Sequence, residues 1–197
     1  RKEKSLPGFN LDLERGYWDK KEIVDSEEGS DNPDISDRTQ RVIPYVEDHR
    51  NCLIFQPHVA LDVGQMASLQ AALKNAIQIR YQLEDGELAA EPLPTEDKRN
   101  AILLYEAAEG GAGVLRRLID DSTALPSVAR EALELVHFDP DTGDDLRQSH
   151  GMTEECVAAC YDCLMSYRNQ RDHQFLDRHA IRDVLMQLAQ ADVEAAP

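Results

Sequence analysis

Three closely spaced cysteines, Cys156, Cys160 and Cys163, constrain the fold of this chain more than any other feature of its sequence. They follow the spacing C-x3-C-x2-C, and the C-x2-C part is a short chelate loop that can place two thiolates on one zinc ion. The first cysteine reaches the same ion only where the backbone turns back on itself. Residues 153–179, which we call the cysteine knuckle, are therefore a candidate metal site.

The same spacing also fits one face of a helix, because positions i, i+4 and i+7 lie on the same side. On an unbroken helix the three side chains would be spread over about 10 Å, at 1.5 Å per residue. Zinc–sulfur bonds of about 2.3 Å do not span that distance. The sequence leaves two interpretations: a helix that breaks near residues 158–161, so that the cysteines converge, or an intact helix whose cysteines are small buried apolar residues.

A structural zinc site has four protein ligands, so three local cysteines require a fourth ligand from elsewhere in the chain. His173 lies within the knuckle and is the first candidate, and His137 is the second. Cys52 is a weaker candidate, because it begins an apolar run at residues 52–55 that predicts a buried strand. The predicted metal ligands are Cys156, Cys160, Cys163, His173 and His137.

The charge of the chain excludes some classes of function. The 197 residues include 38 acidic and 21 basic side chains, for a net charge of −17. Phosphate contacts need clustered Lys and Arg, so we expect any contact with DNA to depend on a local patch or on a partner. No run of about 18 apolar residues predicts a membrane span, and no apolar segment near the start predicts a secretory signal. Clustered cysteines fit a reducing compartment, so the predicted location is cytoplasmic.

Hydrophobic patterns predict an α/β fold: a small sheet of about three strands covered by helices, with a helical C-terminal half that carries the cysteines. The predicted strands are 52–55, 84–94 and 101–106, of which 84–94 is an edge strand because of its prolines. The principal predicted helices are 62–83, 125–137 and 175–191.

Composition also predicts the division of the chain. Residues 1–40 are acidic and poor in periodic apolar residues, so we interpret them as a poorly ordered arm or linker. Residues 41–191 form the predicted folded domain, and residues 192–197 form a tail that we expect to fray.

A glycine-rich turn follows the predicted strand 101–106 and precedes a helix. A strand, such a turn and a helix N-terminus can cradle an anion, because the first amides of a helix point outward. No Lys-Ser/Thr follows, as it does in a P-loop, and Glu106 and Glu109 would repel an anion. We therefore interpret the glycines as close packing between strand and helix.

Three segments together resemble a known family: residues 105–115 (YEAAEGGAGVL), the cysteine knuckle, and residues 169–178 (NQRDHQFLDR). They are similar to the C-terminal domain of unknown function, with a zinc-binding subregion, of MrfA-type superfamily 2 DNA-repair helicases. The same domain occurs in the DISARM antiphage system, in the helicase partner protein DrmB. The resemblance covers roughly residues 50–190. The matching motifs are Glu106 with Gly110, Gly111 and Gly113; Cys160 to Leu164; and Leu176-Asp177-Arg178.

The chain departs from the family at one place. The family often has a further cysteine two positions before the cluster, where this chain has Glu154. Either a histidine completes the site, with His173 tested before His137, or the metal has been lost.

The resemblance implies a non-catalytic accessory domain of a helicase, or of a helicase complex, in DNA repair or antiphage defence. A structural zinc site would stabilise it, and its acidic surface would dock on a superfamily 2 motor. The chain shows no Walker A motif and no DExH box, so we assign it no catalytic or cofactor-binding residues and expect no ATP hydrolysis by the chain alone.

Two alternatives come from other classes of function. The first is a metal-dependent nuclease or other hydrolase that uses Glu106 and Glu109, with His137 or His173 as the base. The second is redox sensing by the cysteines, which is disfavoured because the acidic residues beside them oppose thiolate formation.

Overall fold

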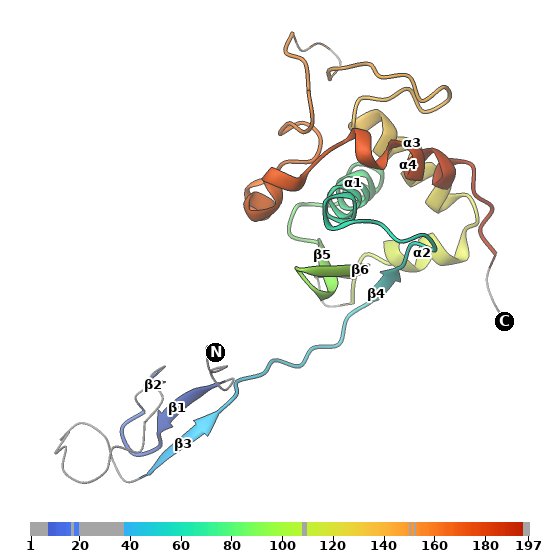
Figure 1. The fold of residues 1–197 in the computed structure, drawn as a ribbon. Coiled ribbons are helices and arrows are strands. Elements are labelled where there is room, and N and C mark those ends of the chain that lie inside the picture. The colour runs from blue at the N-terminus through green and yellow to red at the C-terminus, as the bar shows by residue number, and fades with distance from the viewer. Residues whose placement is uncertain are drawn as a thin grey trace. The chain divides into compact units, whose positions relative to one another are not determined.

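The strands in the described part of the chain form two small antiparallel sheets, one in each of two compact units, residues 1–49 and residues 50–197 (Figure 1). The computed structural model describes residues 8–16, 18–19, 38–107, 110–149, 151 and 153–194. The boundary between the units lies later in the chain than residue 41, where we expected the folded domain to start.

The first unit contains a three-stranded sheet in the order β2-β1-β3. The strands are β1 (Phe9–Asp12), β2 (Trp18–Asp19) and β3 (Thr39–Val42). The buried carboxylate of Asp12 accepts hydrogen bonds from the backbone amides of Glu14 and Arg15, which forms the turn after β1. The sequence has no period that predicts these strands. The remainder of the expected arm lies outside the described residues.

The second unit is built on the sheet β4-β6-β5. Its strands are β4 (Cys52–Phe55), β5 (Leu88–Thr95) and β6 (Lys98–Glu106), and both pairings are antiparallel. Among the described strands β5 pairs only with β6, so its position at the edge of the sheet is confirmed. Pro92 and Pro94 are tolerated there because an edge strand has one side without ladder hydrogen bonds.

One face of this sheet is covered by α1 (Val63–Tyr81). The helix begins at a capping box, in which Asp62 accepts from the Gln65 amide at 2.8 Å and Gln65 accepts from the Asp62 amide at 3.0 Å. It ends at Gln82, which adopts a left-handed conformation. The helix and the sheet contribute Met66, Leu69, Leu73, Ile77, Ile102 and Leu104 to the hydrophobic core.

The remaining helices pack on α1, on one another and on strands β4 and β6 (Figure 1). They are α2 (Val114–Asp120), α3 (Ala124–Leu135) and α4 (Arg182–Ala189), with the 3-10 helices η1 (Tyr167–Phe175) and η2 (His179–Ile181). The predicted α/β class with a three-stranded sheet is confirmed. The predicted helix 175–191 is shorter than expected, because two 3-10 segments occupy the chain before Arg182. Within the described part of the chain, no helix is both long enough and apolar enough to cross a membrane.

Candidate metal centre

The segment from Cys156 to Cys163 contains turns and no α-helix. The amide of Cys163 donates to the carbonyl oxygen of Cys160 at 3.2 Å, which closes a tight turn. The amide of Cys160 in turn points at the Sγ atom of Cys163, at 3.1 Å. The Sγ atoms of these two cysteines lie 3.5 Å apart, and those of Cys156 and Cys163 lie 3.8 Å apart. Of the two interpretations of the cysteine spacing, the structure therefore agrees with the converging one.

His137 approaches the cysteines from the C-terminal end of α3. Its own φ is +63°, so the chain leaves the helix in a left-handed conformation directly after Val136. The amide of Phe138 then donates to the carbonyl of Leu133 at 2.9 Å, and both of these side chains are buried. This reversal brings the Nε2 atom of His137 to 3.3 Å from the Sγ atom of Cys160.

The four side chains together have the dimensions of a tetrahedral zinc site. One ligand atom from each of His137, Cys156, Cys160 and Cys163 lies within 4.8 Å of all the others. Zinc–ligand bonds of 2.0–2.3 Å arranged as a tetrahedron place neighbouring ligand atoms about 3.3–3.8 Å apart. The closest contacts of 3.3, 3.5 and 3.8 Å agree with these edges.

The protonation of these groups in the absence of a cation follows from their burial. Burial raises the pKa of the Cys163 thiol and of the Cys156 thiol, and the neighbouring Cys160 thiol adds to the effect in both. Burial, together with the positive charge of Arg178, lowers the pKa of His137, so its ring is neutral at neutral pH. A neutral imidazole can ligate a metal, whereas the thiols need a bound cation to stabilise their thiolate forms.

The comparisons with known proteins agree with this chemistry. Residues 69–164 match the family model described as the MrfA Zn-binding domain, and the match includes all four residues of the cluster. This part of the chain is an MrfA-type zinc-binding domain. The expected resemblance to that family is confirmed, and structural zinc is its cofactor. The match does not bear on DrmB, so the resemblance to DISARM proteins stays a prediction. No curated protein and no solved structure matches the chain.

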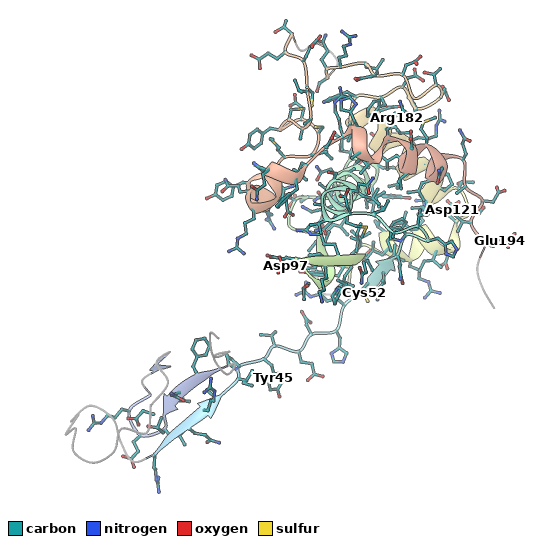
Figure 2. The ribbon with its side chains drawn as sticks, viewed as in Figure 1. Tyr45, Cys52, Asp97, Asp121, Arg182 and Glu194 are labelled. Atoms are coloured by element: carbon teal, nitrogen blue, oxygen red, sulfur yellow. The ribbon has the colours of Figure 1, made fainter. Side chains whose placement is uncertain are left out.

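His173, which we ranked first as the fourth ligand, is not part of the zinc-binding cluster. Its Nε2 atom lies 3.0 Å from the carbonyl oxygen of Ser166 and 3.1 Å from the Oδ1 atom of Asn169, within η1. Cys52 also lies elsewhere, on β4 (Figure 2). We expected Cys52 in the core, but it is exposed because β4 buries only alternate residues.

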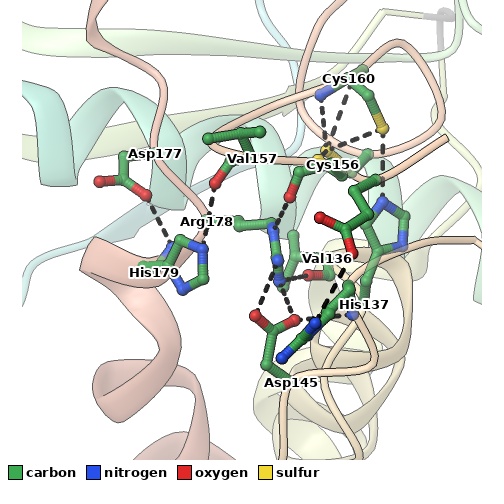
Figure 3. Close-up of polar contacts among 12 residues, drawn as sticks. Val136, His137, Asp145, Cys156, Val157, Cys160, Asp177, Arg178 and His179 are labelled. Atoms are coloured by element: carbon green, nitrogen blue, oxygen red, sulfur yellow. Dashed lines mark hydrogen bonds and ion pairs between the residues drawn. The ribbon is translucent and has the colours of Figure 1, made fainter.

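The buried Arg178 beside the zinc-binding cluster was not among the residues that we predicted for the site. Only 1% of its surface is exposed, and its guanidinium lies 4.9 Å from the centre of the Phe138 ring. It forms a two-point ion pair with Asp145 at 2.7 and 2.9 Å and donates to the carbonyl oxygens of Val136 and Cys156 (Figure 3). The Arg178 guanidinium holds the pKa of Asp145 below its usual range. The one signal for it in the sequence is its place in the Leu-Asp-Arg motif.

Glu106 does not have the environment of a catalytic carboxylate. It is 1% exposed at the end of β6, and its two oxygens accept from the Asn51 side chain and from the amides of Gly113 and Leu115, at 3.0 to 3.1 Å. Burial acts to raise the pKa of Glu106, but these hydrogen bonds outweigh burial and lower it. The carboxylate thus occupies the N-terminus of α2, where an external anion would otherwise bind.

The glycine-rich turn leaves room for the carboxylate of Glu106. Gly111 has a φ of +65°, and a Cβ atom there would lie 1.9 Å from the Oε2 atom of Glu106. The glycines therefore allow close approach of the backbone to Glu106, in agreement with our packing interpretation. Glu109 lies outside the described residues. Because the oxygens of Glu106 already accept three donors, the structure lends no support to a hydrolase built on this residue.

Proposed function

We propose that His137, Cys156, Cys160 and Cys163 are the four ligands of one structural zinc ion. The observation that carries this assignment is the convergence of their four ligand atoms within 4.8 Å. Four protein ligands leave no position open for water or substrate, which is the arrangement of structural rather than catalytic zinc. The binding free energy of the ion then contributes directly to folding, because the unfolded chain has no preformed site.

Elemental analysis of matched cysteine variants tests the assignment. The wild-type chain should contain one zinc per molecule after exhaustive dialysis, and Cys163→Ser should lose most of it. Cys52→Ser is the matched control, because Cys52 is an exposed cysteine outside the cluster and its replacement should leave the zinc content unchanged. Equal zinc in both variants would contradict the assignment.

We further propose that the domain is a non-catalytic accessory part of a superfamily 2 DNA helicase, or of its complex, in DNA repair or antiphage defence in the cytoplasm. The match to the MrfA Zn-binding domain supports the link to a helicase. A structural role is supported because zinc would engage every cysteine of the cluster and because Glu106 serves as a helix cap. The net charge of −17 favours docking on a basic motor surface, with DNA reached only through the complex.

A binding titration with the purified motor of an MrfA-type helicase tests this role. The chain should bind the motor, and the association rate should fall as salt rises, because electrostatic attraction of exposed charges is screened. The chain alone should bind neither single-stranded nor double-stranded DNA. Hydrolysis of ATP or cleavage of DNA by the chain alone would contradict an accessory role.

A further inference from the structure

The two halves of the zinc-binding cluster are held in place by different means. Cys160 and Cys163 belong to one tight turn, in which each residue's backbone contacts the other. These contacts lie within four consecutive residues, and Arg178 takes no part in them. The carbonyl oxygen of Cys163 also accepts a hydrogen bond from the Asn75 side chain on α1, at 2.9 Å. This half is a short chelate loop whose own turn brings its two thiols together.

The segment that carries Cys156 is held from a distance by two consecutive residues, Arg178 and His179. The Nε atom of Arg178 donates to the carbonyl oxygen of Cys156 at 2.9 Å, and its backbone amide donates to that of Ala158 at 2.8 Å. The Nε2 atom of His179 lies 3.1 Å from the carbonyl oxygen of Val157, the residue between Cys156 and Ala158 (Figure 3). Three successive carbonyls of this segment are therefore fixed by residues 178 and 179.

The segment that carries His137 is held by the same guanidinium. The Nη1 atom of Arg178 donates to the carbonyl oxygen of Val136 at 3.3 Å, directly before His137. Its pairing with Asp145 fixes the orientation of the guanidinium plane, because two parallel contacts leave it no freedom to rotate. Asp145 is itself attached to this segment, through a β-bridge with Phe138.

We propose that Arg178 is the positioning residue for two of the four zinc ligands, His137 and Cys156, while the turn of Cys160 and Cys163 brings its own two thiols together. The inference rests on the proposed assignment of these four residues as ligands. It predicts a divided response: loss of Arg178 detaches one half of the site and leaves the other able to bind metal. The residue lies beyond the matched range 69–164, so it extends the functional site to the last part of the chain.

Substitution of zinc by Co²⁺ in the full chain gives a readout of the ligand set itself. The intensity of the thiolate-to-cobalt charge-transfer band follows the number of bound thiolates, and the visible bands report tetrahedral geometry. The wild-type chain should give the spectrum of three thiolates and one nitrogen. Arg178→Met should still bind Co²⁺ through the Cys160–Cys163 loop, with a weaker charge-transfer band, and should bind zinc about 10- to 100-fold more weakly in competition with a chelator.

Three further variants separate positioning from charge and from general stability. Arg178→Lys keeps the positive charge but loses the planar fork, so it should resemble Arg178→Met. Asp145→Asn should show a smaller change of the same kind. Arg182→Met is the matched control, because Arg182 is an exposed arginine nearby that pairs only with Asp183 in the described structure (Figure 2). It should retain the wild-type spectrum and zinc affinity.

The outcomes distinguish the proposals from each other. A wild-type chain without a tetrahedral thiolate spectrum would contradict the zinc assignment itself. A wild-type spectrum that persists unchanged in Arg178→Met and Arg178→Lys would overturn the role of Arg178 alone. If Arg178→Met does not fold even with metal present, the spectra of Asp145→Asn and of His179→Ala decide, because each removes only some of the contacts. Unchanged spectra in both of these variants would also overturn the role.

Discussion

The Nε2 atom of His137 lies 3.3 Å from the Sγ atom of Cys160, although 23 residues separate the two in the chain. This contact joins the end of α3 to the turn that carries the cysteines. It makes the zinc-binding cluster a tertiary site, so the bound ion cross-links two segments that the backbone connects only through a long loop. Loss of the ion should therefore affect the fold beyond the cysteine knuckle.

Replacement of His137 tests which histidine completes the site. His137→Ala leaves three thiolates, so the zinc affinity should fall by more than the about 10- to 100-fold that removal of a supporting residue costs. His173→Ala is the matched control and should change the zinc affinity little, because the ring of His173 contacts Ser166, Asn169 and Tyr161 and lies outside the cluster. Competition with a chromophoric chelator measures the zinc affinity of both variants. A larger loss in His173→Ala would reverse our assignment.

Gly111 should be intolerant of a side chain. In Gly111→Ala, the left-handed backbone at this position alone should destabilise the protein by about 1–3 kcal/mol. The clash between the new methyl group and Glu106 should add to that destabilisation. Gly110 also has a positive φ, but the space around its Cβ position is open. Gly110→Ala therefore measures the destabilisation that comes from the backbone conformation alone. Urea unfolding should give a lower midpoint for Gly111→Ala than for Gly110→Ala. Equal midpoints would mean that Glu106 moves aside without cost.

Glu106 should stabilise the fold in a way that depends on pH. Its pKa is lower in the folded chain than in the unfolded chain, so its stabilisation is complete above the unfolded value and is lost as pH falls through the folded value. Glu106→Gln should cost about 1–3 kcal/mol at pH 7, because a buried amide cannot accept from all of the same donors.

The pH series for Glu106 needs an internal reference, because acid also protonates the zinc ligands. The quantity to compare is the difference in unfolding free energy between wild type and Glu106→Gln at each pH, from urea titrations. This difference should be largest at neutral pH and should shrink below the usual pKa of a glutamate, about 4.3. A difference that stays constant down to pH 3 would contradict the account of Glu106 as an ionised helix cap.

The ion pair between Arg99 on β6 and Asp172 on η1 should stabilise the packing of η1 against the sheet. The two groups lie 2.6 Å apart, and the Arg99 side chain is 5% exposed. Asp172→Asn should destabilise the chain by up to about 3–5 kcal/mol, because it leaves a buried guanidinium without its counter-charge. Arg116 and Asp120 form an exposed comparison at 3.1 Å, and Asp120→Asn should cost no more than about 1 kcal/mol. Thermal unfolding of both variants measures the contrast.

Much of the second unit could be predicted from local patterns. The periodic apolar residues of α1 and the prolines of β5 identified a buried helix and an edge strand, because each pattern reflects a single local requirement. The convergence of the cysteines was one of two open interpretations, since C-x3-C-x2-C fits both a turn and a helix. The contact that decides between them is the 3.8 Å distance between the Sγ atoms of Cys156 and Cys163, because an intact helix would place these positions about 10 Å apart along its axis.

The features that the sequence left open or missed depend on tertiary contacts. His173 looked better than His137 because it is nearer to the cysteines in sequence, but the left-handed turn at His137 carries the more distant residue to them. Arg178 gave no signal as a buried residue, because its burial depends on Asp145 and on carbonyls from two other segments. The strands of the first unit are too short to show a period.

X-ray absorption at the zinc edge tests the central claim most directly. The purified wild-type chain should show one zinc with three sulfur neighbours at about 2.3 Å and one nitrogen neighbour at about 2.0–2.1 Å. The same measurement on His137→Ala should lose the imidazole signal and keep the three sulfurs. A wild-type chain without zinc, or with fewer than three sulfur neighbours around it, would contradict the assignment of His137, Cys156, Cys160 and Cys163 as the ligands.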